Sequence, residues 1–367
     1  MTASQFAQDA AQIAAERLSR GEIDRRSFMA AVGALGLGIG LEPDAHSAQA
    51  AEIVVCNWGG AAVSAFSKAY GEPFTRKSGI KVVVVGTGPA VGTIRAMVES
   101  GKVIWDTTDG GMIDSLTLSK NGLVQPIDYT IVDKSQVPDA FAGKYGVANY
   151  VFSNVLAYDS GATRGIAPDS WTDFFDLQRF PGKRTMCKWI QGQLEFVLLA
   201  DGVAPAALYP LDVDRAFKKL APMLPHIIFW DGGAQSQQLF REGEVVMGNI
   251  WHTRANLLNK EAPHFKWTWS QNLLFASAWS VPKGNPAGKK VFDFINSTLD
   301  PACQLTLFRL MGNGPSNPKT LELMTPQDAA VNPTSADNAR THIAVNPAYY
   351  AEHETELQNR YLDFISR

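Results

Sequence analysis

Hydrophobic residues along the chain alternate between short apolar runs and longer stretches with helical spacing. Ile53 to Cys56 and Lys81 to Val85 are rich in β-branched residues, a composition typical of strands that are covered on both faces. Residues 63–78 between them carry apolar side chains at helical spacing and end at Gly79. This order predicts a βαβ unit at the start of the fold.

The same alternation continues to the C-terminus and predicts an α/β protein. Further strands are expected at residues 154–158, 184–189, 227–230, 245–250 and 276–281. Further helices are expected at residues 93–99, 193–200, 213–220, 235–240, 289–299, 302–309 and 352–364. A chain of 367 residues exceeds what one hydrophobic core usually holds, so two lobes are expected.

The first 50 residues have the pattern of an export signal. Arg25 and Arg26 precede the mostly apolar run from Phe28 to Leu41, which contains four Gly. A membrane-spanning helix needs about 20 apolar residues, so this run is too short to be an anchor. The small residues of Ala48-Gln49-Ala50 predict cleavage after Ala50. The paired arginines resemble a twin-arginine signal, which exports proteins that have already folded.

Charge and motif content narrow the classes of function. The formal net charge of −3 gives no basic surface for nucleic acid. The sequence lacks G-x-S-x-G, H-E-x-x-H and P-loop lysine patterns, so a binding protein without a cofactor is expected rather than an enzyme. Cys56, Cys187 and Cys303 have no metal-like spacing, and one disulfide or three buried thiols are both open.

Four tryptophans stand at the ends of predicted strands. Trp58, Trp189, Trp230 and Trp251 each fall near the carboxyl end of a strand and close to a turn. Ligands of open α/β sheets bind beyond these ends, and indole rings bury a large area with few rotatable bonds. The four rings together predict a pocket for an organic ligand, although each could instead plug the core.

A series of short motifs runs from Ile53 towards the C-terminus. They are IVVCNWGG (53–60), PFTRKSGIKV (73–82), WDTTDGG (105–111), NGLVQPID (121–128), SWTDFFD (170–176), FREGEVVMGNIW (240–251), AWSVPKGNP (278–286) and GPSNP (314–318). In this order and spacing the chain resembles the periplasmic solute-binding proteins of ABC transporters. The resemblance is to the spermidine/putrescine-binding type, in extracellular solute-binding protein family 1.

The resemblance implies a two-lobed α/β fold with crossing hinge strands and a central ligand cleft. Lobe 1 would comprise residues 51–152 and about 277–325, and lobe 2 residues 153–276 and about 326–367. It also implies a monomer in the periplasm that binds a small-molecule solute and has an ABC permease and its ATPase as partners. Neither a cofactor nor nucleic acid is implied.

The family's site residues carry over only in part. Trp58 and Trp251 match cleft aromatic residues of the family, and Phe275 lies near the second crossing strand. The acid-x-x-acid pair of polyamine binders is replaced by Trp189-Ile190-Gln191-Gly192. Another family acid falls on Ser277, and a family glutamine aligns with Tyr350. The carboxylates that usually hold a polyamine are therefore missing from these positions.

The predicted site offers cationic residues in place of the missing acids. Arg254 follows Trp251 by three residues, and Lys188 precedes Trp189. A guanidinium suits a bidentate carboxylate, so the predicted ligand is a carboxylate or a zwitterion such as an amino-acid derivative. An ion pair of Arg254 with Glu242 or Glu244, and a solvated Lys188, are the structural alternatives.

Other residues of the predicted site have two open interpretations. Gly59 and the Asp109-Gly110-Gly111 turn could admit a ligand to the backbone or form plain tight turns. Asp109 and Asp231 could hold an amine or cap a turn.

Two rival functions have a motif of their own. Gly86, Gly88 and Gly92 follow a predicted strand, and Asp106 lies 20 residues after Gly86, which imitates a dinucleotide fingerprint and so an exported oxidoreductase. The pair Tyr349-Tyr350 imitates a ferric-binding receptor of the same fold.

Overall fold

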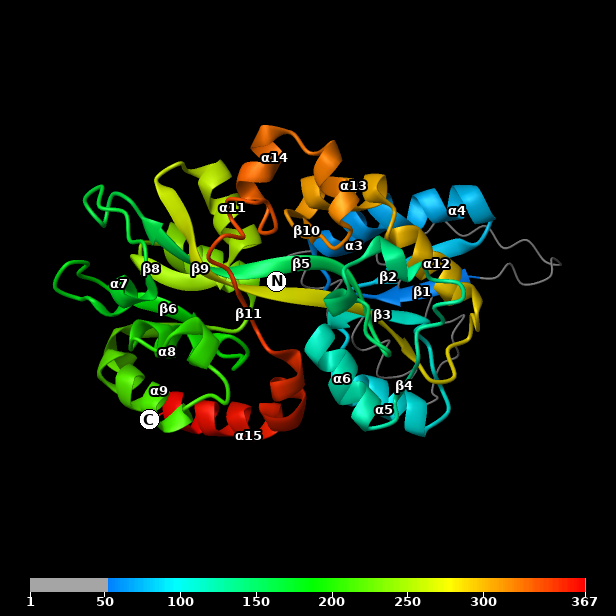
Figure 1. Cartoon of the computed structure of the whole chain (residues 1–367), viewed down its shortest axis with the longest axis horizontal. Helices are drawn as coiled ribbons and strands as arrows, with labels where there is room; N and C mark the ends of the chain where they lie inside the picture. The colour runs from blue at the N-terminus through cyan, green and yellow to red at the C-terminus, as the bar shows by residue number, and fades with distance from the viewer. Residues whose placement is uncertain (1–51, 367) are drawn as a thin grey trace. The chain divides into compact units, whose positions relative to one another are not determined.

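The computed structural model describes residues 52–366, so the predicted signal at residues 1–50 lies outside the described residues. The chain forms two compact units, each of which is an α/β assembly (Figure 1). Of the described residues, unit 1 contains 52–149 together with Ala278–Leu307, and unit 2 contains Tyr150–Ser277 and 308–366. Among the described helices, none is both long and apolar enough to cross a membrane.

Unit 1 is built on a parallel sheet. β1 (Glu52–Cys56) pairs in parallel with β2 (Lys81–Val85) on one side and with β3 (Thr107–Gly111) on the other. The C-terminal part of β9 (Phe265–Pro282) pairs with the short strand β4 (Val124–Gln125). One core cluster joins β1 and β2 to α5 (Val91–Glu99) and α6 (Met112–Lys120).

The remaining helices of unit 1 form an aromatic cluster. The predicted helix at 63–78 is present as α3 (Ala61–Phe66), the π-helical turn η1 (Ser67–Gly71) and α4 (Glu72–Ser78). Rings of this segment pack edge-on against Trp279 and against Phe294 of α12 (Lys290–Thr298). The 3-10 turns η2 (Lys134–Gln136) and η3 (Asp139–Phe141) and most of α13 (Pro301–Met311) complete the unit.

Unit 2 is built on a mixed sheet in the order β9-β5-β8-β6-β7. β5 (Val147–Asp159) is antiparallel to β8 (Met247–Trp251), whereas β6 (Arg184–Cys187) is parallel to both β8 and β7 (Ile227–Trp230). α10 (Gly233–Arg241) and α11 (His252–Glu261) pack on the cluster formed by Val155, Ala157 and Ile250.

The other elements of unit 2 surround this sheet. The α-helices are α7 (Trp171–Phe175), α8 (Gln193–Ala200), α9 (Val213–Leu220), α14 (Pro326–Val331) and α15 (Pro347–Ile365). The 3-10 turns are η4 (Pro205–Ala207), η5 (Ala221–His226) and η6 (Pro318–Leu323). The short strands are β10 (Gly314–Pro315) and β11 (Ile343–Ala344).

The unit boundaries differ from the sequence prediction after Leu307. Residues 308–325 were expected in lobe 1 but belong to unit 2. The cause is β10, which pairs antiparallel with β5 at Tyr150 and Val151. Burying β10 against β5 keeps the segment after α13 with unit 2.

The cysteines are free thiols. Cys56 and Cys187 are buried, and Cys303 is partly buried. The disulfide that the sequence left open is therefore absent among these three residues. Burial raises the pKa of Cys56 to about 12 and that of Cys187 to about 12, so both stay protonated and unreactive.

Candidate functional site

The carboxyl ends of three parallel strands in unit 2 bring predicted site residues to one edge of the sheet. β6 and β7 are in register from Arg184 opposite Ile227 to Cys187 opposite Trp230. The N–H of Lys188 continues this ladder to the carbonyl of Trp230 at 2.8 Å. Since β8 is parallel to β6, Trp251 at its end lies at the same edge.

Trp189 is displayed at this edge. Its side chain is 58% exposed, and its Nε1 donates to the carbonyl of Asp231 at 3.2 Å. The Asp231 carboxylate lies 3.3 Å from Nζ of Lys188. Because both charged side chains are exposed, this ion pair contributes little to stability, and the carboxylate remains accessible to another cation.

Trp251 forms the apolar part of the same edge. Its ring is half-buried and meets Trp230 edge-on at 5.2 Å and Phe152 at 6.3 Å between centroids. These contacts fix the plane of the indole, so that it can be a rigid apolar surface for a small organic molecule.

Arg254 lies in the first turn of α11, directly after Trp251. Its Nη1 donates to Oε1 of Gln237 at 3.3 Å. Within residues 52–366 no carboxylate forms an ion pair with it, so the alternative pairing with Glu242 or Glu244 is not present. Burial, and then repulsion from Arg241, lowers the pKa of Arg254. The guanidinium is thus a half-buried cation whose charge no acidic side chain of the described chain balances.

The start of α10 adds positive potential beside Arg254. A Cβ built on Gly233 would lie 2.4 Å from Nε of Arg254, so the guanidinium rests directly against the first residue of α10. The N-terminus of a helix carries the positive end of its dipole. A guanidinium at this end is electrostatically unfavourable by itself and favours a bound anion.

Two predicted site residues are core residues in the structure. Trp230 is fully buried, and its Nε1 donates to the carbonyl of Asn249 at 3.0 Å. Tyr350 is also fully buried, where its hydroxyl donates to Glu195 at 2.9 Å and accepts the N–H of Gly192 at 3.1 Å. Their polar atoms are used within the fold, so neither side chain presents a surface to a solute.

Phe275 and Ser277 on β9 are also largely enclosed. Phe275 is 8% exposed and stacks on Phe152 with 5.2 Å between centroids. A Cβ on Gly192 would lie 2.7 Å from its ring, so the glycine before α8 is needed for this packing. Ser277 is buried. Phe275 contacts Phe152, which in turn packs edge-on against Trp251, so Phe275 supports the Trp251 ring indirectly.

In unit 1, the loop after β1 displays Trp58. The side chain is 57% exposed. Gly59 has φ +77°, and a Cβ there would lie 2.5 Å from the carbonyl oxygen of Gly86. The loops after β1 and β2 are therefore held together at glycine backbone contact. Asp109 on β3 is instead buried and accepts the amide of Asn149 at 2.9 Å.

The motifs of the rival functions have structural roles. Asp106, the acid of the dinucleotide-like pattern, accepts the N–H groups of Val54 at 2.7 Å and Ala287 at 2.6 Å. It thereby joins the sheet to the loop after β9. Tyr350 of the paired tyrosines bonds inside the core, and the described residues contain no group of three His, Cys, Asp or Glu placed to hold a metal.

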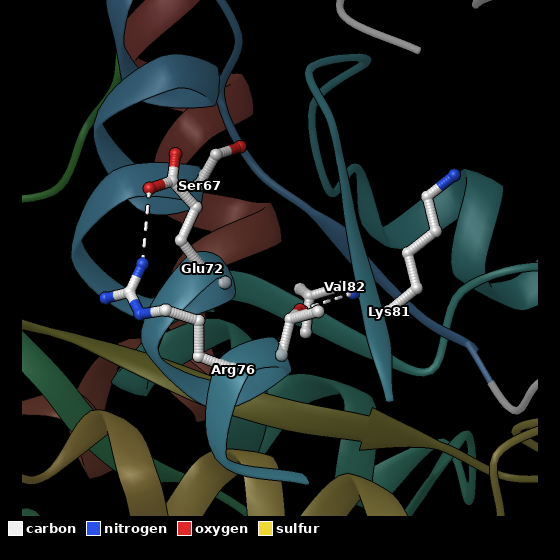
Figure 2. Close-up of a pocket in the computed structure, with 7 residues that line it drawn as sticks. Ser67, Glu72, Arg76, Lys81 and Val82 are labelled. Atoms are coloured by element: carbon white, nitrogen blue, oxygen red, sulfur yellow. Dashed lines mark hydrogen bonds and ion pairs between the residues drawn. The ribbon is translucent and has the colours of Figure 1, made fainter. Parts of the chain in front are cut away.

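A surface groove of about 280 Å³ beside the π-helical turn of unit 1 contains none of the predicted site residues. Figure 2 shows Arg76 turned towards Glu72, 3.7 Å from its carboxylate, while Lys81 extends away from the helix. The charged side chains of this groove are therefore paired with each other or directed away from it. The groove lacks the converging polar groups that would hold a solute.

Sequence reasoning missed three residues around Arg254 and Trp251. Phe152 lies on the part of β5 that precedes the expected strand, and Gly233 and Gln237 lie on α10. The Gly232-Gly233 pair, one residue after the predicted strand at 227–230, was the available signal for a close backbone approach. No signal in the sequence paired Gln237 with a residue 17 positions later.

Comparison with known proteins gives relatives across most of the chain. The model of the bacterial extracellular solute-binding protein family matches residues 69–334. The γ-aminobutyric acid-binding protein of Pseudomonas aeruginosa is 34% identical over 330 residues, covering 88% of this chain and 93% of that protein.

Solved structures extend this similarity to the fold. The Atu4243-GABA receptor has a TM-score of 0.80 at 34% identity, over 86% of this chain and 97% of that one. An ABC transporter substrate-binding protein from Bradyrhizobium japonicum has a TM-score of 0.81 at 35% identity, over 86% and 99%. A spermidine/putrescine-binding protein from Streptococcus pneumoniae, 15% identical with a TM-score of 0.69, shares the fold alone.

These findings confirm the family resemblance and the two-lobed α/β fold predicted from the sequence. They also confirm the expected class of function, since the relatives are binding proteins and not enzymes. The chain belongs to the bacterial extracellular solute-binding proteins.

Proposed function

We propose that this protein is the periplasmic receptor of an ABC importer and binds a small zwitterion of the ω-amino-acid type, with Arg254 as the carboxylate-binding residue. The observation that carries the proposal is the half-buried guanidinium of Arg254, which has a neutral amide partner and no carboxylate among the described residues. A bound carboxylate would balance this charge through two parallel hydrogen bonds.

The neighbouring residues suit the rest of such a ligand. Trp251 and the exposed Trp189 offer apolar surface for a short methylene chain. Among the described residues, the Asp231 carboxylate is held only by the exposed Lys188, so it can exchange that partner for a ligand ammonium at little cost.

Similarity to relatives supports the same ligand class. The relative from P. aeruginosa and one of the solved structures are named for γ-aminobutyric acid. The polyamine-binding relative is far more distant, and the acids of that type are replaced in this chain by residues 189–192 and Ser277. The predicted monomeric state and the permease and ATPase partners belong to this proposal.

The test is binding of 4-aminobutyrate to the chain from Ala51 onward, after bound ligand has been removed by unfolding and refolding. A ligand at one hundred times its Kd adds about 2.7 kcal/mol, which should raise the melting midpoint by roughly 5 to 10 °C. Putrescine, butyrate and 4-aminobutyrate are compared. A shift with putrescine alone would refute the carboxylate assignment, and a shift with butyrate equal to that with 4-aminobutyrate would refute the zwitterion.

Arg254→Ala should weaken 4-aminobutyrate binding by about 10- to 100-fold, because a charge-assisted bidentate contact is lost. Titration calorimetry measures the change. Arg241→Ala is the matched control, since that arginine is exposed and already paired with Glu261 at 2.7 Å. The control should keep its affinity, and an unchanged affinity of Arg254→Ala would reject the proposal.

A further inference from the structure

We propose that Gly233 and Gln237 of α10 are specificity-determining residues, which hold the Arg254 guanidinium in the orientation that selects a carboxylate over its neutral analogues. This inference rests on the proposed function of Arg254. It concerns two residues that do not need to touch the solute, so they act as positioning residues.

Gly233 gives Arg254 and Trp251 the space that they occupy. A Cβ at Gly233 would lie 2.4 Å from Nε and 3.0 Å from Cζ of Arg254, and 2.9 Å from Cζ3 of Trp251. These atoms belong to side chains, so they would move rather than break the fold. Any side chain larger than hydrogen at residue 233 must therefore displace the guanidinium and the indole edge together.

Gln237 fixes one edge of the guanidinium. It lies one turn after Gly233, it is buried, and its Oε1 accepts from Nη1 of Arg254 at 3.3 Å. An amide oxygen orients the guanidinium without neutralising it. A carboxylate at the same place would orient it equally well but would occupy the charge that the solute needs.

The first experiment compares adjacent glycines. Gly233→Ala should weaken 4-aminobutyrate binding about 10-fold or more, whereas Gly232→Ala should leave the affinity within about twofold. Gly232 is the matched control because a Cβ there meets nothing within 4 Å and its φ of −145° suits alanine. Equal affinities of the two variants would overturn the role of Gly233.

The second experiment separates charge from packing. In Gln237→Glu the new side chain has nearly the same shape as glutamine but places a carboxylate beside Arg254. This variant should weaken the binding of 4-aminobutyrate at least 10-fold. The melting midpoint of the unliganded protein should not fall. The readout is the ratio of affinities for 4-aminobutyrate and 4-aminobutanamide, in which an uncharged amide replaces the carboxylate and the ammonium is kept. A merely structural defect would weaken the binding of both ligands equally and leave the ratio unchanged. Lost positioning of the guanidinium would weaken the binding of 4-aminobutyrate more, so that the ratio of the two affinities falls towards one.

The outcomes distinguish this inference from the proposed function. If Arg254→Ala removes the preference for the carboxylate while Gly233→Ala and Gln237→Glu retain it, the positioning role is wrong and the ligand assignment stands. If Arg254→Ala retains the preference, or if the wild-type protein binds no carboxylate of the panel, the proposed function itself is wrong. If all three variants lose the preference and Gly232→Ala keeps it, both are supported.

Discussion

Glu195 is a fully buried carboxyl group in unit 2 with two tyrosine partners and no cation among its described contacts. The hydroxyls of Tyr209 and Tyr350 donate to it at 2.5 Å and 2.9 Å. Burial raises the pKa of Glu195 to about 7, and the tyrosine hydrogen bonds only partly offset this. The carboxyl is thus protonated at mildly acidic pH and costs stability once it ionises.

The pH dependence of stability tests this assignment. Because the folded pKa is above the unfolded value of about 4.5, the stabilising contribution of Glu195 is complete below pH 4.5 and is lost as the pH rises to about 7. Relative to Glu195→Gln, the wild-type free energy of unfolding should fall across this window by on the order of 3 kcal/mol. Chemical denaturation at several pH values measures it.

A second buried titratable group has to be separated from Glu195 in this measurement. Burial lowers the pKa of His252 to about 4. The contribution of His252 to the free energy of unfolding therefore rises with pH between about pH 4 and 6.5, opposite to that of Glu195. Only the difference between variant and wild type therefore reports Glu195, and parallel profiles of the two proteins would contradict the assignment.

At the scale of elements, Gly86 serves the fold of unit 1 through a close backbone contact. A Cβ on Gly86 would lie 2.5 Å from the Cα of Gly59 and 2.7 Å from Val63. The two loops that follow β1 and β2 touch through their backbones here, and this contact carries Trp58. The first glycine of the dinucleotide-like pattern is thus explained by loop packing.

Gly86→Ala should destabilise the protein by about 2 to 3 kcal/mol, because the opposing atom is backbone and cannot move aside. Gly92→Ala is the matched control in the same run. A Cβ at Gly92 meets nothing within 4 Å, and the residue lies inside α5, so the change should be neutral or stabilising by up to about 1 kcal/mol. Thermal unfolding decides, and equal midpoints for the two variants would disprove the loop contact.

Elements with a continuous apolar run were predictable from the sequence, whereas elements that mix polar and apolar residues were not. β7 and α8 have the bounds expected from their apolar runs. β9 extends from Phe265 to Pro282 although only 276–281 was expected, because its first half alternates polar and aromatic residues at a partly exposed surface. α11 was missed because its sequence HTRANLLNKE is mostly polar, and it carries Arg254.

The same limit applies to the candidate site. Trp189 and Trp251 follow parallel strands that end at one sheet edge, and Arg254 and Trp251 both lie against Gly233. That these residues bind a solute stays a prediction. The burial of Trp230 and Tyr350 could not be read from the sequence. For Trp230 it depends on the direction of the ring at the end of β7, and for Tyr350 on hydrogen bonds to Glu195 and Gly192, which are distant in the sequence. A strand-end position predicts proximity to the site and leaves the side-chain direction undetermined.

At the scale of the whole molecule, the export prediction concerns residues outside the described range. The exported protein should begin near Ala51, as N-terminal sequencing can establish. Replacing Arg25 and Arg26 together by Lys should stop export if the twin-arginine route is used, because Lys keeps the positive charge but not the arginine pair. Export of the double variant at the wild-type rate would assign the protein to another secretion route.

The three free thiols bear on how such a protein can be made. Cys56 and Cys187 sit inside separate units with raised pKa values, and Cys303 is partly covered. No bond between them has to form, so the folded state needs no oxidant and no disulfide isomerase. Such a chain can reach its folded state in a reducing cytoplasm, before it meets any membrane, and dithiothreitol should leave its melting midpoint unchanged.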